Sequence, residues 1–154
     1  MSKQNNIPNY IFKNVQIFAV NDSQMLLQNA IGSNSKGLLV VANAPRPELI
    51  TLLEKILKAV HHDLSHDALL LNIQKPTPLS FVDLCRKSDS SITKAIFFGQ
   101  SPASVGLNIN ATLYQYITLD QYQILFVDDL ARIHDDQQLK QKLWKSLQEM
   151  FSVG

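Results

Sequence analysis

Two adjacent carboxylates are the residues of this chain best placed to do chemistry. Asp128 and Asp129 directly follow the apolar run 123–127, which we expect to form a buried strand. Open α/β sheets bind ligands beyond the carboxyl ends of their strands, and both side chains would lie there. Paired carboxylates of this kind can position water or hold a divalent cation. Asp128 and Asp129 are therefore a candidate acidic site.

The residues around this pair permit two interpretations. In the first, the pair holds Mg²⁺ for phosphate chemistry together with three residues that follow it in the sequence: His134, Asp135 and Asp136. In the second, the pair ends a strand, and the later acids complement the dipole of a C-terminal helix. The other expected strand ends carry no acid, since they hold Asn43, Asn72 and Gly99. We favour the second interpretation and keep the acidic site as the alternative.

Two other groups have side chains capable of chemistry. His62 and His66 lie four residues apart, a spacing that places two metal ligands on one face of a helix. They fall between an expected helix and an expected strand, however, where a solvated connection is more usual. Cys85 has no histidine near it in the sequence and belongs to an amphipathic segment, so we expect a packed thiol. With no glycine-rich phosphate loop present, the sequence predicts neither a metal nor a cofactor.

A short loop motif follows the apolar segment 94–98. Its residues are Gly99, Gln100, Ser101 and Pro102. The motif resembles the water-activating loop of uracil-DNA glycosylases, which also follows a strand and reads Gly-Gln-Asp-Pro-Tyr. In that family the aspartate positions water and the tyrosine packs beside the flipped base, whereas this chain has Ser101 and Ala103. Because a serine cannot replace a carboxylate in that role, the resemblance implies the glycosylase-like fold without its catalytic groups.

The elements that would position these residues alternate between strand and helix. We expect strands at 10–12, 15–20, 37–43, 68–73, 95–98, 114–118 and 124–127, and helices at 25–31, 49–60, 79–85 and 136–151. The unbroken apolar runs are typical of strands buried on both faces of a parallel sheet. In the last helix, Trp144 and Phe151 widen the apolar stripe. The sequence predicts an α/β fold, a three-layer α/β/α sandwich with a mainly parallel central sheet.

The bulk composition limits the class of protein. At 154 residues the chain is long enough for one domain, with residues 1–9 as a flexible N-terminal arm and 10–154 as a single α/β/α domain. The net charge is +1 and the basic residues are scattered, so we expect no strong direct nucleic-acid binding. One cysteine, no membrane-length apolar run and a polar start predict a soluble cytoplasmic protein without membrane contact.

A longer pattern runs from Gly37 to the end of the chain. It begins with an apolar strand and turn at 38–43, which precede an amphipathic helix. A strand and a Pro-containing loop follow at 69–78, and then a strand that ends in glycine at 95–99. The pattern closes with Asp129-Leu130 before the helix that contains Leu143-Trp144. This order resembles the psi subunit of bacterial DNA polymerase III, a clamp-loader accessory protein. Psi subunits adopt a sandwich similar to that of uracil-DNA glycosylases, so both resemblances imply one architecture.

The psi resemblance implies a non-catalytic adaptor in DNA replication. In that family the folded domain binds the chi subunit, and an N-terminal peptide packs on the collar of the clamp-loader ATPase subunits. The residues of this chain that would anchor such a peptide are Ile7, Tyr10, Ile11 and Phe12. The same residues could instead pack as the first strand of the domain. The alternative is an enzyme, a nucleobase-acting hydrolase of the glycosylase-like fold that positions water with Asp128 or Asp129.

Overall fold

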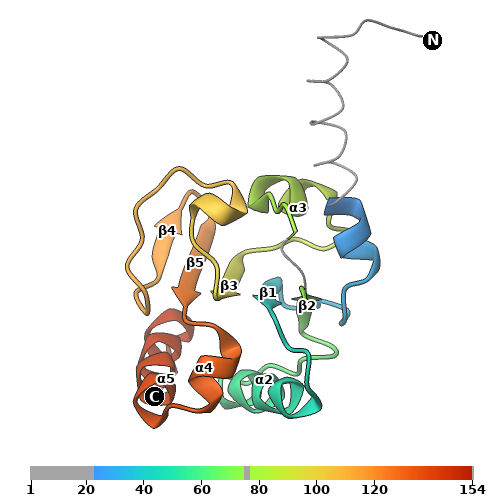
Figure 1. Ribbon diagram of the computed structural model, residues 1–154. Helices are drawn as coiled ribbons and strands as arrows, with labels where there is room; N and C mark the ends of the chain where they lie inside the picture. The colour runs from blue at the N-terminus through green and yellow to red at the C-terminus, as the bar shows by residue number, and fades with distance from the viewer. Residues whose placement is uncertain (1–22, 75–76, 154) are drawn as a thin grey trace, which may run out of the picture.

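The computed structural model describes residues 23–74 and 77–153 (Figure 1). The expected strands at 10–12 and 15–20 lie outside the described residues. So do the N-terminal arm at 1–9 and its expected anchors, Ile7, Tyr10, Ile11 and Phe12. No helix in the described part of the chain is long and apolar enough to cross a membrane.

A five-stranded mixed sheet forms the centre of the described fold. Its strands are β1 (Leu38–Ala42), β2 (Ala68–Asn72), β3 (Lys94–Phe98), β4 (Ile117–Leu119) and β5 (Tyr122–Val127), in the spatial order β2-β1-β3-β5-β4. The pairs β1–β2, β1–β3 and β3–β5 are parallel, and β4 is an antiparallel edge strand on β5. The α/β class and the mainly parallel sheet predicted from the sequence are therefore confirmed.

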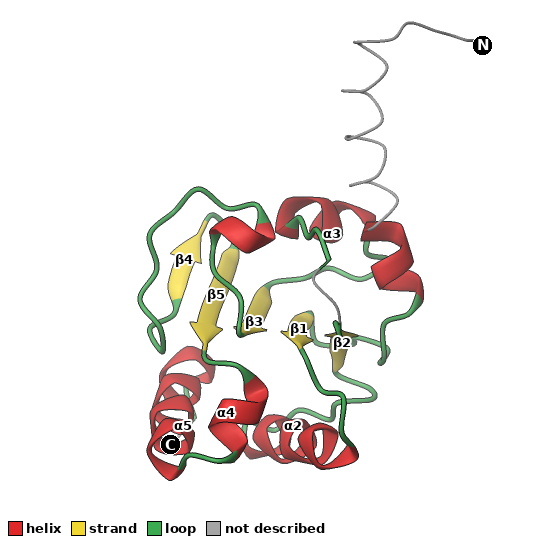
Figure 2. Cartoon of the chain, in the orientation of Figure 1, coloured by secondary structure: helices red, strands yellow, loops and turns green. Residues whose placement is uncertain are grey.

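Helices cover both faces of the sheet (Figure 2). One face carries α2 (Pro47–Ala59), α4 (Leu130–His134) and α5 (Gln137–Phe151). The other carries α3 (Phe81–Lys87), the short 3₁₀ turn η1 (Ala103–Val105) and a helical segment at 23–28. This arrangement fits the predicted three-layer sandwich.

The sheet divides the apolar side chains into two cores because successive residues of a strand point to opposite faces. In β1, Leu38 and Val40 join the core beneath α2 and α5, whereas Leu39 and Val41 join the core beneath α3. All four side chains are fully buried. Burial on both faces explains why these strands have no polar alternation in the sequence.

The C-terminal helix α5 forms as its sequence predicts. Asp136 caps it by accepting hydrogen bonds from the backbone N–H groups of Gln138 and Leu139, at 2.9 and 3.3 Å. The side chains buried against the sheet recur at helical spacing: Leu139, Leu143, Leu147 and Met150. Phe151 packs half-buried against the same core, but Trp144 is 39% exposed and does not extend the buried stripe.

Three elements differ from the sequence expectation. The strand expected at 114–118 is shorter and begins later, at Ile117–Leu119. Tyr114 lies outside it, because its φ of 67° breaks the extended backbone; its N–H donates to the carbonyl of Phe126 in β5. The helix expected at 25–31 covers 23–28, and Ile31 pairs with Leu70 in an isolated antiparallel bridge. Helix α4 lies between the expected strand at 124–127 and the expected helix at 136–151, where the sequence predicts no element.

Candidate functional site

The crossing of the chain between strands defines where a ligand site would lie. From β1 the chain passes to β2 on one side, and from β2 it returns to β3 on the other side of β1. The carboxyl ends of β1 and β3 therefore border the topological switch point, the usual binding position of open α/β sheets. Val41 and Phe97 are partners in the parallel register, so the two strands end at the same level.

Two adjoining depressions lie at this edge of the sheet. The strand-end crevice has a volume of about 370 Å³, and its lining includes Asn43, Ile73, Phe98, Gly99, Gln100 and Asp129. The adjoining depression, of about 380 Å³, is lined by Gly99, Gln100, Ser101, Ser104, Leu113, Val127, Asp128 and Asp129. The glycosylase-like loop and the acidic pair, which are far apart in the sequence, thus meet at one place.

Gly99 permits the close approach of these two segments. Its φ of +74° is in the left-handed region that side chains disfavour. A Cβ atom at this position would lie 3.1 Å from Oδ1 and 3.2 Å from Cα of Asp129. Because residue 99 has no side chain, the loop passes closely over Asp129 without displacing it.

The polar residues of the loop bond mainly to one another. The backbone N–H of Ser101 donates to Oγ of Ser104 at 2.9 Å, and the N–H of Ser104 donates to Oγ of Ser101 at 3.2 Å. The Ser104 hydroxyl lies 2.8 Å from both Oε1 of Gln100 and the Ser101 carbonyl, and its one proton serves either. Pro102 precedes η1 and accepts backbone bonds from Val105 and Leu107. Ser101 thus shapes the loop.

Both carboxylate oxygens of Asp128 have a side-chain partner. Oδ2 accepts a 2.7 Å hydrogen bond from the Tyr114 hydroxyl, and Oδ1 lies 3.3 Å from Nη1 of Arg132. The Asp128 side chain is only 16% exposed. Burial, together with the hydrogen bond to Asp128, raises the pKa of the Tyr114 hydroxyl well above its usual range. Asp128 therefore anchors the segment before β4 to the end of β5.

Asp129 is the carboxylate of the pair that faces both depressions. It is half-buried and precedes α4, where its backbone carbonyl accepts from the N–H of Ile133. With the described residues its carboxylate forms no hydrogen bond and no ion pair, and it does not cap α4 through its side chain. One carboxylate, rather than a converging pair, is available at the strand-end crevice.

The acids that follow in the sequence do not join this site. His134 pairs with Asp135 at 2.9 Å, and this contact lowers the pKa of Asp135. Asp136 caps α5. Within residues 23–74 and 77–153, no three His, Cys, Asp or Glu side chains are grouped to hold a metal ion.

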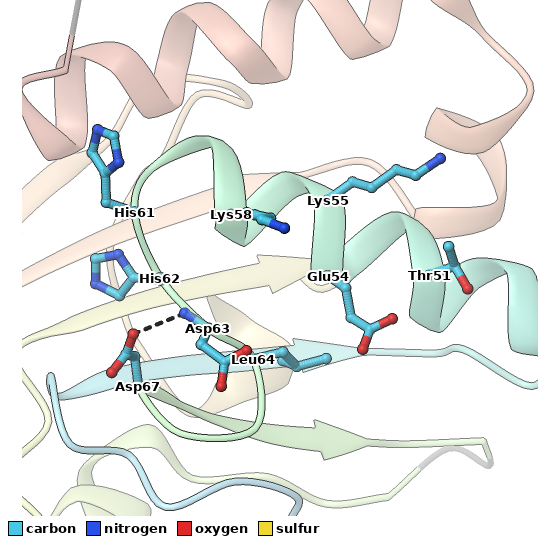
Figure 3. A pocket seen from close by; sticks show the side chains of 9 residues that line it. All are labelled: Thr51, Glu54, Lys55, Lys58, His61, His62, Asp63, Leu64 and Asp67. Carbon is cyan, nitrogen blue, oxygen red and sulfur yellow. Dashed lines mark hydrogen bonds between the residues drawn. The ribbon is translucent and has the colours of Figure 1, made fainter.

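His62 and His66 lie in the connection after α2. His62, but not His66, lines a depression of about 690 Å³ there (Figure 3). Nδ1 of His62 lies 2.8 Å from the Val60 carbonyl, whereas Nδ1 of His66 lies 3.1 Å from Oδ1 of Asp67. The two rings therefore engage different partners. The walls of this depression carry both signs of charge, including Lys58 and Asp67.

Asp67 holds this connection together. Its Oδ2 accepts a 2.8 Å bond from the backbone N–H of Asp63, the contact drawn in Figure 3, and Oδ1 accepts from Ser35. Nζ of Lys36 lies 3.6 Å from Oδ2. The Asp63 N–H, then His66 and Ser35, hold the pKa of Asp67 well below its usual range. The role of Asp67 is structural.

Cys85 lies on α3 and is half-buried. Burial raises the pKa of its thiol to about 11, although the contact with Tyr122 opposes this. A thiol with this pKa is almost wholly protonated at neutral pH and is a weak nucleophile. This agrees with the packed thiol expected from the sequence.

An apolar groove that is not among the sites predicted from the sequence lies between α2 and α5. Its volume is about 200 Å³, and it is lined by Leu52, Lys55, Ile56, Ala59, Ile133, Lys140, Leu143, Trp144 and Leu147. We call it the Trp144 groove, after the aromatic side chain in its lining. The available signal was Trp144 itself, at the margin of the α5 stripe.

No protein-family model matches the chain, and no curated protein matches it significantly. Function must therefore be inferred from the sites described above, because a fold alone does not define one.

Proposed function

We propose that this chain is a non-catalytic, protein-binding adaptor, a psi-like accessory subunit of a bacterial clamp loader acting in the cytoplasm. Its fold would then be the uracil-DNA-glycosylase-like variety of the α/β/α sandwich. The folded domain holds one protein partner, a chi-like subunit. Ile7, Tyr10, Ile11 and Phe12 contact a second, the clamp-loader ATPase subunits.

The observation that carries this proposal is the Trp144 groove. Trp144 is 39% exposed and lies beside an apolar groove, so its ring is open to a side chain of a partner. Tryptophan is also among the residues that contribute most to protein interfaces. The groove has apolar walls and few polar groups, which suits attachment better than catalysis.

The state of the strand-end residues supports the same proposal. A glycosylase needs a carboxylate on the loop after the strand, and this chain has Ser101, which bonds within the loop. Asp128 is engaged by Tyr114 and Arg132. Moving either residue into a catalytic role would require breaking contacts that hold the fold.

Affinity purification of the tagged protein from its own cells tests the adaptor. Clamp-loader ATPase subunits and a chi-like protein should co-purify in fixed proportion. Replacing Ile7, Tyr10, Ile11 and Phe12 by serine should release the ATPase subunits and leave the chi-like protein bound. Absence of every clamp-loader subunit from the wild-type preparation would contradict the proposal.

One observation favours a second candidate, a nucleobase-acting hydrolase. Asp129, Gly99 and Gln100 line the same crevice at the topological switch point, and Asp129 has a carboxylate available there. Uracil release from single-stranded and duplex DNA by the pure protein tests this candidate. The enzyme would be favoured if the wild type releases uracil, Asp129→Asn abolishes this release and Asp128→Asn retains part of it. If the wild type releases uracil from neither substrate, this candidate is ruled out.

A further inference from the structure

We propose that the Trp144 groove is the docking site for an acidic, amphipathic segment of a protein partner. An aliphatic side chain of the partner enters beside Trp144, and its flanking carboxylates meet Lys55 and Lys140. This inference rests on the proposed adaptor function and specifies which surface of the folded domain is used and which chemistry it recognises.

The apolar part of the groove combines buried side chains with partly exposed ones. Leu143 and Leu147 of α5 are almost fully buried, whereas Ile56 of α2 is half-buried and Trp144 is 39% exposed. At about 200 Å³ the groove is smaller than the usual 300–1,000 Å³ of small-molecule sites. It is of the size to accept one or two side chains of a larger partner.

The charges at the groove are of one sign. Lys55 on α2 and Lys140 on α5 are its charged lining residues, and no carboxylate of the described chain lines it. Neither lysine forms an ion pair or a side-chain hydrogen bond within residues 23–74 and 77–153, although the charge of Lys140 contributes to the lowered pKa of Asp135. A cation on each wall of an apolar groove favours a partner with acidic flanks, since complementary charge guides association.

The same charges argue against the chain as its own occupant. Residues 1–22 contain two lysines, Lys3 and Lys13, and one acid, Asp22, so their charge does not complement the groove. A second copy bound around a twofold axis would bring the same surface patch to itself. Lys55 and Lys140 would then face lysines.

Trp144 is the only tryptophan of the chain, so its fluorescence reports on the groove directly. The probes are two synthetic amphipathic helical peptides with identical leucine positions, one flanked by glutamates and the other by lysines. The acidic peptide should shift Trp144 emission to the blue, protect it from acrylamide and bind about tenfold more tightly than the basic one at low salt. Added salt should reduce this preference.

A charge-reversed variant provides the decisive comparison. Lys55→Glu/Lys140→Glu should reverse the preference between the two peptides. Lys87→Glu/Lys145→Glu makes the same change of charge at positions outside the groove lining and should keep the wild-type preference. Circular dichroism checks that each variant is folded. Equal affinity for both peptides, or a preference that the groove variant does not change, would overturn the inference.

Two further results would also overturn it. A blue shift that grows with protein concentration without peptide would assign the groove to a second copy. If Trp144 emission is already protected from acrylamide in the dilute free protein, another segment of the same chain occupies the groove.

Purification from cells separates this inference from the proposed function. Lys55→Glu/Lys140→Glu should lose the chi-like partner and keep the ATPase subunits. If the variant keeps every partner, the adaptor stands and the groove assignment is wrong. If the wild-type protein captures no clamp-loader subunit, the proposed function itself fails.

Discussion

At the scale of single residues, the contact between Asp128 and Tyr114 determines how the acidic pair is used. The Tyr114 hydroxyl donates to Asp128 at 2.7 Å, and the Tyr114 carbonyl accepts from Oγ of Ser146 on α5 at 2.6 Å. One tyrosine thus ties the end of β5 to α5. Asp129, its neighbour in the sequence, has no comparable contact and remains available at the crevice.

Removing the Tyr114 hydroxyl should therefore destabilise the fold. Tyr114→Phe leaves a half-buried carboxylate without its donor and should lower the free energy of unfolding by about 1–2 kcal/mol. Urea titration at neutral pH measures this. Tyr116→Phe, at an exposed tyrosine, is the matched control and should change little.

The stability of the wild type and that of Tyr114→Phe should also depend differently on pH in alkali. The folded-state pKa of Tyr114 is raised above the unfolded value of about 10 by burial and by Asp128. The contribution of the Tyr114 hydroxyl to the free energy of unfolding is therefore complete below about pH 10 and is lost as the pH rises above that value. The stability difference between wild type and Tyr114→Phe should narrow there, and a constant difference would contradict this reading.

Asp67 should give the opposite dependence on pH. The pKa of Asp67 is lowered in the folded state. The Asp67 carboxylate therefore contributes to the free energy of unfolding at neutral pH, and this contribution is lost as the pH falls below about 4. Asp67→Asn should be less stable than wild type at pH 7, and the two unfolding midpoints should converge in acid. Asp63→Asn should follow the wild-type curve, because the Asp63 carboxylate is exposed and accepts a hydrogen bond from the exposed Ser65 hydroxyl.

At the scale of elements, the loop after β3 depends on Gly99. Gly99→Ala would place a Cβ against Asp129 in a left-handed backbone conformation and should cost about 1–3 kcal/mol of stability. Gly106→Ala has nearly the same φ, +77°, but its nearest contact would be 3.6 Å away. Thermal unfolding of both variants separates the close contact from the backbone strain, and equal losses would show that the contact with Asp129 is unimportant.

The elements predicted well from the sequence are those whose signals are local. Strands such as β1 show their burial on both faces as an unbroken apolar run, and α5 carries both a cap at Asp136 and a regular stripe. Helix α4 was missed because it has only five residues, too few to show a period. The strand expected at 114–118 is longer than the observed one because sequence spacing does not reveal the partners of Tyr114, which are Phe126 in β5, Asp128 after β5 and Ser146 in α5.

The candidate site was predictable in position more than in chemistry. Asp128, Asp129 and Gly99 were each expected at strand ends, and a parallel sheet brings such ends together. Which carboxylate is engaged depends on Tyr114, 14 residues before Asp128. The Trp144 groove depends on how α2 and α5 lie beside each other, so the sequence marks Trp144 at the margin of the α5 stripe but not the groove itself.

At the scale of the whole molecule, the two layers of helices have different roles in this account. The layer of α3 covers the sheet and contains Cys85 as a packed thiol. The layer of α2, α4 and α5 covers the other face of the sheet (Figure 1). The same layer presents the Trp144 groove. We expect its exposed tryptophan to serve partner binding more than folding.

Comparison of Trp144→Ala with Leu143→Ala tests that expectation most directly. Leu143 is buried, so Leu143→Ala should lower the free energy of unfolding by about 2–5 kcal/mol. Trp144→Ala should lower it less and should nevertheless release the chi-like partner in purification from cells. A Trp144→Ala protein that is strongly destabilised, or one that is folded and retains every partner of the wild type, would contradict the account.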